Sequence, residues 1–351
     1  MHPPDRVPGR TASVGGQEWL YFSGTAYLGM PSRAAFRELV NEGMALYGTH
    51  FGGSRLSPSC FSLYEETERH LAKWLGSPDA LLVSSGTLAG RLLRSCLRDW
   101  GELVASPGTH AALLGHEDEI PPEGDAWISQ LIESRQKKPV PTLITTSSVN
   151  PLKPERHDFG WLEEWPATSP LILVIDDSHG LGITGSKGRG ILSELKAPSG
   201  VRIVLCSSLG KGLSLPGGII AGPREVIAKL RNTPLFAGAS PPPPAHFYAF
   251  LKAEKLYDEA RRELDRNVRQ FSEGLEASDF VHYMDGYPVF RVSDTGVTDL
   301  FHRHRIMISH FSYPDPKGSP VSRIILNALH LPADIHKLIK LLQVFQHQTE
   351  A

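Results

Sequence analysis

Cysteine is scarce in this chain, and long apolar runs are missing. The three cysteines, Cys60, Cys96 and Cys206, are an odd number without metal-ligand spacing, so we expect free thiols in a reducing compartment, no disulfide framework and no metal site. No apolar stretch approaches the roughly 20 residues that span a bilayer. The opening MHPPDRVPGR lacks the apolar core of a signal peptide. We therefore expect a cytoplasmic protein without a membrane-spanning segment.

Neither sign of charge is in excess. The 36 basic and 38 acidic residues leave a formal net charge of -2, and basic runs do not exceed short pairs such as Lys137-Lys138. This balance gives no reason to expect nucleic-acid binding. An apolar content of 40% with 21% charged residues is typical of a globular protein, and 351 residues are enough to bury a large core.

Apolar strand-like runs alternate with segments of helical period over the middle of the chain. That alternation is typical of an α/β fold, in which helices cover both faces of a mostly parallel sheet. A helix expected at 64–75 places Leu71, Trp74 and Leu75 on one face and ends before Gly76, a favourable terminator. The expected strands are 80–84, 102–105, 142–146, 171–175, 203–206 and 218–221.

A second unit is expected after the proline run at 241–244. Helix formers fill 245–275, and the proline run marks where that helix begins. We predict an N-terminal segment (1–45), a large domain (46–245) and a smaller C-terminal α+β domain (246–351). The elements expected in the last of these are strands at 287–292, 306–309 and 323–326 and helices near 298–304 and 333–348.

Two segments carry the most specific pattern in the sequence. The strand at 171–175 leads to Asp176 and then His179, and the strand at 203–206 leads to Lys211 between two glycines. Pyridoxal phosphate needs a carboxylate that keeps its ring nitrogen protonated and a lysine that carries its aldehyde as a Schiff base. A histidine can hydrogen-bond the ring's phenolic oxygen. The pattern therefore predicts a pyridoxal phosphate site, with glycines that let the backbone bend beside the ring.

Each of these residues alone also has an ordinary structural explanation. Aspartate after a strand is often a turn former or cap, histidine is often hydrogen-bonded in a core, and Gly-Lys-Gly is often a surface loop. Their joint order favours the coenzyme site. Gly86 and Thr87 follow a strand and open a predicted helix, where free amides attract phosphate, although an ordinary capped turn has the same sequence.

Several segments in this order resemble the α-oxoamine synthases. These fold-type I pyridoxal phosphate enzymes join an amino acid to an acyl thioester, and the resemblance runs from about Tyr21 to the C-terminus. It implies a mostly parallel large-domain sheet, a smaller C-terminal α+β domain and a homodimer. The segments are YFSGTAYLGM (21–30), YGTHFGGSRLS (47–57), EETERHLAKWLG (65–76), LLVSSGTLAG (81–90), those of Asp176 and Lys211, FAGASPPPPA (236–245) and SRIILNALH (322–330).

The resemblance also implies roles for individual residues. His110 matches a histidine that stacks over the coenzyme ring, and Arg323 matches the arginine that binds the amino acid's carboxylate, a task suited to its planar fork. Taken alone, either residue could equally lie on the surface. The other implied contacts are Gly86, Thr87 and Ser208 with the coenzyme phosphate, Ser148 with the ring oxygen, Ala239 and Ser240 with the neighbouring subunit's phosphate, and Arg55 with substrate, in an interface loop that includes His50.

The implied reaction joins a small amino acid to an acyl thioester of coenzyme A or a carrier protein, with loss of carbon dioxide, and forms an α-amino ketone. Lys211 would remove the α-proton while Asp176 keeps the ring protonated. The alternatives are an aminotransferase on the same fold and a pyridoxal phosphate-binding protein without catalysis. Aminotransferases of this type generally carry tyrosine at the position of His179. Ala26 replaces an asparagine that usually helps to bind the substrate carboxylate, so glycine, alanine and serine stay open.

Overall fold

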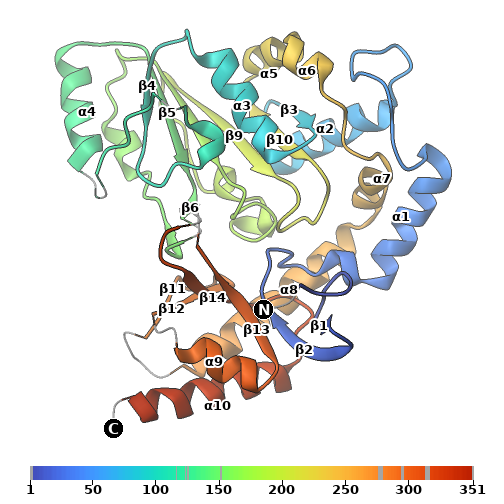
Figure 1. The fold of residues 1–351 in the computed structure, drawn as a ribbon. Coiled ribbons are helices and arrows are strands. Elements are labelled where there is room, and N and C mark those ends of the chain that lie inside the picture. Colours follow the sequence, from blue (N-terminus) through green and yellow to red (C-terminus); the bar gives the residue numbers. More distant parts are fainter. Residues whose placement is uncertain are drawn as a thin grey trace.

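A six-stranded sheet forms the centre of the larger half of the molecule (Figure 1). The computed structural model describes residues 3–115, 117–122, 124, 126–150, 152–275, 280–293, 296–312 and 317–349. The strand order is β3-β10-β9-β8-β5-β4, with β4, β5, β8 and β9 parallel and β10 antiparallel to both of its neighbours. The strands are β3 (Asp79–Val83), β4 (Glu102–Ala105), β5 (Thr142–Ser147), β8 (Leu171–Asp176), β9 (Val201–Ser208) and β10 (Gly218–Gly222). The expected α/β fold with a mostly parallel sheet is confirmed.

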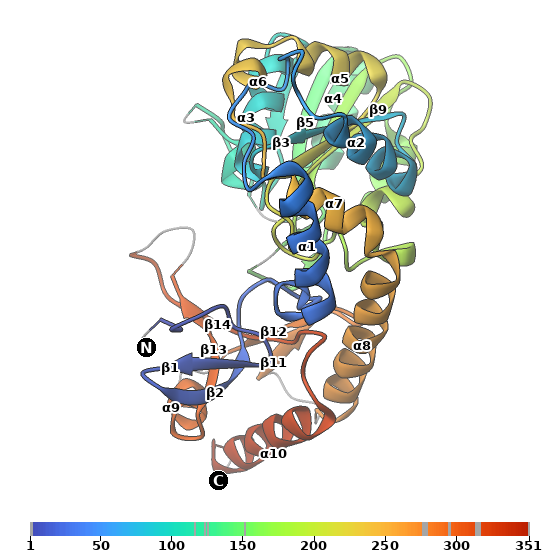
Figure 2. The same ribbon diagram turned by 90° about the vertical axis from the view of Figure 1, so that its right-hand side faces the viewer.

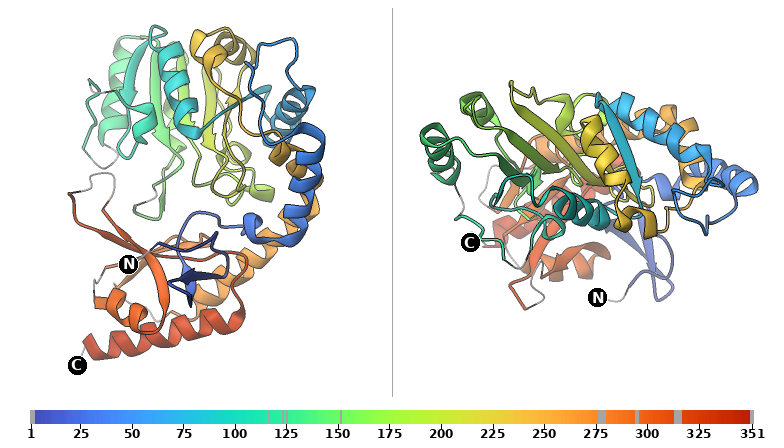
Figure 3. Two further views of the ribbon diagram at one scale, coloured as in Figure 1. Left: turned by 45° about the vertical axis from the view of Figure 1, so that its right-hand side comes forward. Right: turned by 90° about the horizontal axis from the view of Figure 1, so that it is seen from above.

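Successive residues of the central strands face two different cores. Leu173 and Ile175 of β8 pack in the cluster that contains Leu71, whereas Ile172 and Val174 pack in the cluster that contains Leu92. This period of two explains the continuous apolar run, because both faces of the sheet are covered (Figure 3). The helices of this half are α2 (Ser62–Leu75), α3 (Gly86–Leu97), α4 (Ala126–Lys137), α5 (Arg224–Arg231) and α6 (Pro234–Gly238).

A second sheet unites the two ends of the chain. Its strand order is β1-β2-β13-β14-β12-β11, and β2 pairs in parallel with β13. The sequence did not predict the two N-terminal strands. The elements are β1 (Thr11–Val14), β2 (Gln17–Phe22), β11 (Val281–Tyr283), β12 (Val289–Val292), β13 (Ile306–Phe311), β14 (Val321–Ile325), α9 (Gly296–Arg303) and α10 (Pro332–Thr349).

Helices α1 (Ala34–Tyr47), α7 (Ala245–Lys252) and α8 (Glu254–Glu273) connect the two sheets (Figure 2). The single helix expected over 245–275 is in fact α7 and α8, because Ala253 leaves the helical region with φ −99° and ψ 16°. The remaining short elements are β6 (Val149–Asn150), β7 (Glu155–Arg156), η1 (Met30–Ser32), η2 (Ala111–Leu113), η3 (Gly160–Glu164), η4 (Ser186–Gly188) and η5 (Ile191–Ser193).

All three cysteines are free thiols. Over the described ranges, no helix combines the length and the apolar character needed to cross a bilayer, and no cluster of histidine, cysteine and acidic side chains is arranged to hold a metal ion.

Candidate active site

The residues of the Asp-His and Lys segments meet at the carboxyl ends of β8 and β9. Asp176 is the last residue of β8 and lies in register with Cys206 of β9, two residues before that strand ends at Ser208. Parallel strands deliver their following loops to the same edge of a sheet, which is where α/β proteins bind ligands. The fold therefore brings the Asp-His segment and the Lys segment close together in space.

Lys211 and His179 are in direct contact. Their Nζ and Nε2 atoms are 2.8 Å apart. Burial lowers the pKa of the Lys211 amine; nearby Asp176 opposes this shift and the positive charge of Arg323 adds to it. Burial, together with the charges of Lys211 and Arg323, holds the pKa of His179 well below its ordinary range. The site therefore favours a neutral imidazole beside an amine that releases its proton more easily than an exposed lysine.

Two tyrosines that the sequence analysis missed hold His179. The Tyr27 hydroxyl is 3.2 Å from His179 Nδ1, and the Tyr287 hydroxyl donates to the His179 carbonyl over 3.1 Å. Burial raises the pKa of Tyr27 to about 12, so its hydroxyl keeps its proton. Tyr27 lies in the N-terminal Tyr-Leu-Gly motif, which offered a signal. Tyr287 lies in the second sheet's half of the chain and offered none.

Asp176 is buried and is oriented by the backbone after β8. Its Oδ1 accepts from the Ser178 amide at 2.8 Å, and its Oδ2 lies 3.5 Å from His110 Nδ1. His110 opens η2, where the same Nδ1 accepts from the Ala112 amide at 3.2 Å. The ring expected to stack over the coenzyme thus lies beside the carboxylate expected to hold the ring nitrogen.

Gly86 lies against Ser208 at the start of α3. Ser85 caps this helix by accepting from the Leu88 amide at 3.0 Å. A Cβ at Gly86 would be 2.8 Å from the Cα of Ser208, so only glycine allows this approach. The Ser208 amide donates to the Ser178 hydroxyl at 2.8 Å, which fixes its loop. Thr87 is exposed on the same first turn. The helix N-terminus and Ser208 together form a place for an anion.

The glycines beside Lys211 were expected to let the backbone bend, but the bends lie elsewhere in the loop. Neither has a positive φ; the loop turns instead at Ser214, with φ 55°, and at Gly217, with φ 110°. A Cβ at Gly212 would be 2.4 Å from the Leu181 carbonyl oxygen. Gly212 therefore allows the Lys211 loop to pack closely on the loop of His179.

Arg323 of β14 faces this site from the second sheet. It lies across from Arg291 of β12 and Ser309 of β13, and its guanidinium is 5.3 Å from the centre of the Phe311 ring. Its charge contributes to the lowered pKa values of both Lys211 and His179. The predicted carboxylate-binding arginine and the predicted coenzyme lysine therefore lie close together.

Five other predicted positions lie outside this constellation. Ser148 is buried and donates its hydroxyl to Asp177. Arg55 is buried in an ion pair with Glu68 at 3.0 Å. Arg55, Ala239 and Ser240 line one small cavity, while His50 is exposed. Between described residues, no hydrogen bond or ion pair joins these side chains to Lys211, and their coenzyme or substrate roles stay predictions.

The assembled residues fit pyridoxal phosphate. An amine with a lowered pKa can hold the aldehyde, the Asp176 carboxylate can face the ring nitrogen, and the crowded junction of Gly86 and Ser208 can take the phosphate. The chain thus offers an amine, a carboxylate, an imidazole and an anion site in one place. These are the groups expected to meet the aldehyde, the ring nitrogen, the phenolic oxygen and the phosphate of the coenzyme.

Comparisons with known proteins agree with this geometry. The family model described as aminotransferase class I and II matches residues 131–342. The 8-amino-7-oxononanoate synthase of Aeromonas salmonicida is 28% identical over 355 residues, which covers 96% of this chain and 88% of that protein. The protein of the same name from Dechloromonas aromatica is 28% identical over 361 residues, which covers 95% of this chain and 92% of that protein.

Solved structures share the fold. The serine palmitoyltransferase of Sphingomonas wittichii superposes with a TM-score of 0.81 at 18% identity, over 99% of this chain and 92% of that one. The 8-amino-7-oxononanoate synthase of Francisella tularensis superposes with a TM-score of 0.72 at 20% identity, over 95% and 99%. The relatives and structural neighbours named above are α-oxoamine synthases. With the family model spanning more than half of its residues, the chain belongs to the aminotransferase class I and II family of pyridoxal phosphate enzymes.

Proposed function

We propose that this protein is a pyridoxal phosphate-dependent acyltransferase of the 8-amino-7-oxononanoate synthase type. It joins a small amino acid to an acyl thioester, releases carbon dioxide and forms an α-amino ketone. The observation that carries the proposal is the contact between Lys211 and His179, with Asp176 and Arg323 beside it. The similarity to the synthases over nearly the whole chain supports the reaction type.

Lys211 is the proton carrier of the proposed reaction. Pyridoxal phosphate, when bound, supplies an aldehyde that links to amines and a ring that accepts electrons from the α-carbon. Burial lowers the pKa of Lys211, so that its neutral amine can take the α-proton of the substrate. Asp176, whose Oδ1 accepts from the Ser178 amide, presents its other oxygen as the fixed negative charge that keeps the ring nitrogen protonated.

His179 is the proposed hydrogen-bond donor at the phenolic oxygen. When Tyr27 donates its proton to Nδ1, the neutral ring carries its remaining proton on Nε2, the atom 2.8 Å from Lys211. The low pKa of His179 keeps the ring neutral, so this tautomer persists. An imidazole at this position distinguishes the site from that of the aminotransferases, which generally have a tyrosine there.

Substrate recognition is proposed to depend on Arg323. Its planar guanidinium suits the carboxylate of an amino acid. Ala26, directly before Tyr27, offers no side-chain hydrogen bond where the resemblance places asparagine. We therefore expect the substrate carboxylate to receive one contact fewer than in the resembled enzymes. The acyl donor is proposed to be a thioester of coenzyme A or a carrier protein, and the assembly a homodimer.

The test is release of free thiol from a panel of acyl-coenzyme A thioesters, each incubated with the full chain, pyridoxal phosphate and glycine, alanine or serine. We expect one pairing to release thiol and carbon dioxide in equal amounts. Lys211→Ala should abolish release. Lys196→Ala removes an exposed lysine that has no predicted role in the site, and it should leave thiol release unchanged.

Other outcomes would replace the proposal. Formation of a keto acid from the amino acid without thiol release would indicate an aminotransferase. A coenzyme absorbance that survives Lys211→Ala, with no product from any pairing, would indicate a binding protein without catalysis.

A further inference from the structure

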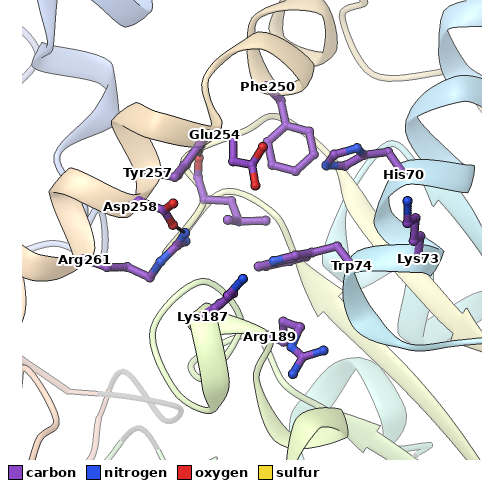
Figure 4. A pocket seen from close by; sticks show the side chains of 11 residues that line it. His70, Lys73, Trp74, Lys187, Arg189, Phe250, Glu254, Tyr257, Asp258 and Arg261 are labelled. Atoms are coloured by element: carbon purple, nitrogen blue, oxygen red, sulfur yellow. Dashed lines mark hydrogen bonds and ion pairs between the residues drawn. The ribbon is translucent and has the colours of Figure 1, made fainter.

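A cavity lies outside the proposed active site. It is a groove of about 400 Å³ between α2, the segment 186–189 and the junction of α7 with α8 (Figure 4). None of the residues predicted to hold the coenzyme lines it. Leu213, two residues after Lys211, forms part of its wall. A volume of this size is in the range of small-molecule sites.

The floor of the groove is aromatic. Phe250 and Tyr257 are buried and meet edge to face, with ring centres 5.6 Å apart. Trp74 of α2 is half-buried, and its indole extends into the middle of the groove (Figure 4). A partly exposed flat ring at the centre of a cavity offers a stacking surface for another flat ring.

The rim of the groove is cationic. Lys73, Lys187, Arg189 and Arg261 line it against the two carboxylates Glu254 and Asp258. Arg261 is paired with Asp258 at 2.5 Å. The amines of Lys73 and Lys187 make no ion pair with any residue in the described ranges. The excess of positive charge is therefore available to an anion.

Lys187 is held on this rim by an uncommon backbone conformation. Its φ of 56° and ψ of 28° lie in the left-handed region, which disfavours a side chain. Neighbouring Gly188 packs closely against the carbonyl oxygen of Gly182 and the side chain of Arg261, which a Cβ at this glycine would approach to 2.6 and 3.0 Å. Strain of this kind persists where the surroundings fix it and is concentrated at functional sites.

We propose that this groove binds a nucleoside diphosphate or its equivalent in a larger molecule. The base stacks on Trp74, and the phosphates contact Lys187, Arg189 and Lys73. Glu254, which has no ion pair with any described residue, accepts hydrogen bonds from the amino group of the base or the hydroxyls of the ribose. An aromatic floor with a divided rim, mostly cationic and partly acidic, matches a ligand that is flat at one end and anionic at the other.

The groove is connected to the Lys211 loop. The Tyr257 hydroxyl donates to the Leu213 carbonyl at 2.7 Å, and the Ser214 amide donates to the Lys211 carbonyl at 3.1 Å. A ligand that moves Tyr257 or Leu213 therefore displaces the loop that carries the lysine. The ligand has two possible sources, a free nucleotide that regulates the enzyme or the nucleotide end of a coenzyme A thioester; the second rests on the proposed function.

The experiment is equilibrium dialysis of ADP against the full-length, coenzyme-loaded protein, with adenosine and pyrophosphate as half-ligands. We expect ADP to bind more tightly than either half, and Lys187→Ala and Trp74→Ala each to weaken binding at least tenfold. Lys196→Ala, a matched charge removal outside the groove, should bind ADP like the unchanged protein. Absence of ADP binding at millimolar concentration, or equal binding by all three variants, would overturn the proposal.

Coenzyme A then distinguishes the two sources. If coenzyme A displaces ADP and ADP raises only the KM for acyl-coenzyme A, the groove receives the nucleotide end of the substrate. If ADP stays bound in the presence of coenzyme A and changes kcat, the groove is a regulatory site. Because dialysis needs no turnover, ADP binding is measured even if the proposed acyl transfer fails, so the two proposals fail separately.

Discussion

The histidine at the centre of the proposed site depends on residues far from it in sequence. Tyr27 comes from the segment after β2 and Tyr287 from the segment before β12, yet both hydroxyls contact the loop after β8. The Tyr27 hydroxyl contacts the ring of His179, and the Tyr287 hydroxyl donates to its backbone carbonyl. Under the proposed hydrogen bond from Tyr27, the proton position on the imidazole is set by a neighbour rather than by the histidine itself.

Tyr27→Phe should therefore impair the site without removing any proposed catalytic group. Loss of one hydrogen bond of about 1 kcal/mol corresponds to a roughly fivefold lower kcat, because His179 is no longer held in one tautomer. The pH dependence of the bound coenzyme's visible absorbance should shift as well, which a purely structural role would not produce. Tyr283→Phe, on the exposed part of β11, is the matched control. An unchanged absorbance titration in Tyr27→Phe would contradict this role.

His330 makes the stability of the fold sensitive to acid. Its Nδ1 accepts from the Asn327 amide at 3.1 Å, its Nε2 donates to the Tyr21 carbonyl at 3.0 Å, and its ring stacks on Phe22. Burial lowers the pKa of His330 to about 4. Between pH 4 and the ordinary value near 6.5, this histidine binds a proton in the unfolded chain but not in the folded chain. The contribution of neutral His330 to the free energy of unfolding is therefore complete above about pH 6.5 and is lost as pH falls.

Urea unfolding at pH 7.5 and pH 5 measures this effect. The shift corresponds to about 2 kcal/mol lower stability at pH 5. In His330→Gln, which does not titrate, the difference between the two pH values should be smaller by that amount. Because the Gln variant is expected to be less stable already at pH 7.5, the free energies of unfolding at the two pH values are compared within each protein. Equal pH dependence of the two proteins would show that His330 takes up its proton in the folded state.

At the scale of elements, the start of α3 depends on the absence of one Cβ. The helix begins at Gly86, capped by Ser85, and the missing side chain lets Ser208 at the end of β9 approach to 2.8 Å from the Cβ position. Two elements distant in sequence thereby create the proposed anion site. Neither element forms it alone, because a helix N-terminus needs a second wall to hold a phosphate in place.

Gly86→Ala should weaken coenzyme binding more than it weakens the fold. The added methyl forces α3 away from Ser208, which we expect to cost about 1–3 kcal/mol of stability and at least about tenfold in pyridoxal phosphate affinity. Affinity is measured by coenzyme absorbance under dilution. Gly160→Ala, at an exposed glycine where a Cβ would meet only an ordinary contact with Asp158 at 3.4 Å, should change neither quantity. Coenzyme binding by Gly86→Ala at full affinity would show that the phosphate lies elsewhere.

The same elements show how far a sequence can predict such a site. The continuous apolar run of β8, its terminal Asp176 and the following His179 are local features, so strand and site residues could be located together. The break between α7 and α8 at Ala253 could not be predicted, because helix formers continue on both sides of it. The contact of Tyr287 with His179 and the burial of Arg55 against Glu68 depend on tertiary packing that no local pattern encodes.

At the scale of the whole molecule, the two ends of the chain complete one sheet. The pairing of β2 with β13 places N-terminal residues among C-terminal strands, and Arg10 crosses to Asp334 at the start of α10. Both guanidinium contacts are 2.7 Å long, and Asp334 Oδ2 also accepts from the Leu331 amide at 2.8 Å. Although burial alone would raise it, these hydrogen bonds hold the pKa of Asp334 below its ordinary value.

Arg10→Ala should therefore loosen the N-terminal strands and the start of α10 together. The Asp334 carboxylate, 5% exposed, would lose its cation, while the 40% exposure of Arg10 limits the cost to about 1–2 kcal/mol. Urea unfolding measures the loss, and limited proteolysis should cut first near β1. Arg6→Ala, whose side chain is exposed, should behave like the unchanged protein. Asp334 stays ionised to a lower pH in the folded protein than in the unfolded chain. The difference in stability between the unchanged protein and Arg10→Ala should therefore shrink as pH falls below about 4. A variant as stable and as protease-resistant as the parent would show that strand pairing alone holds the two ends together.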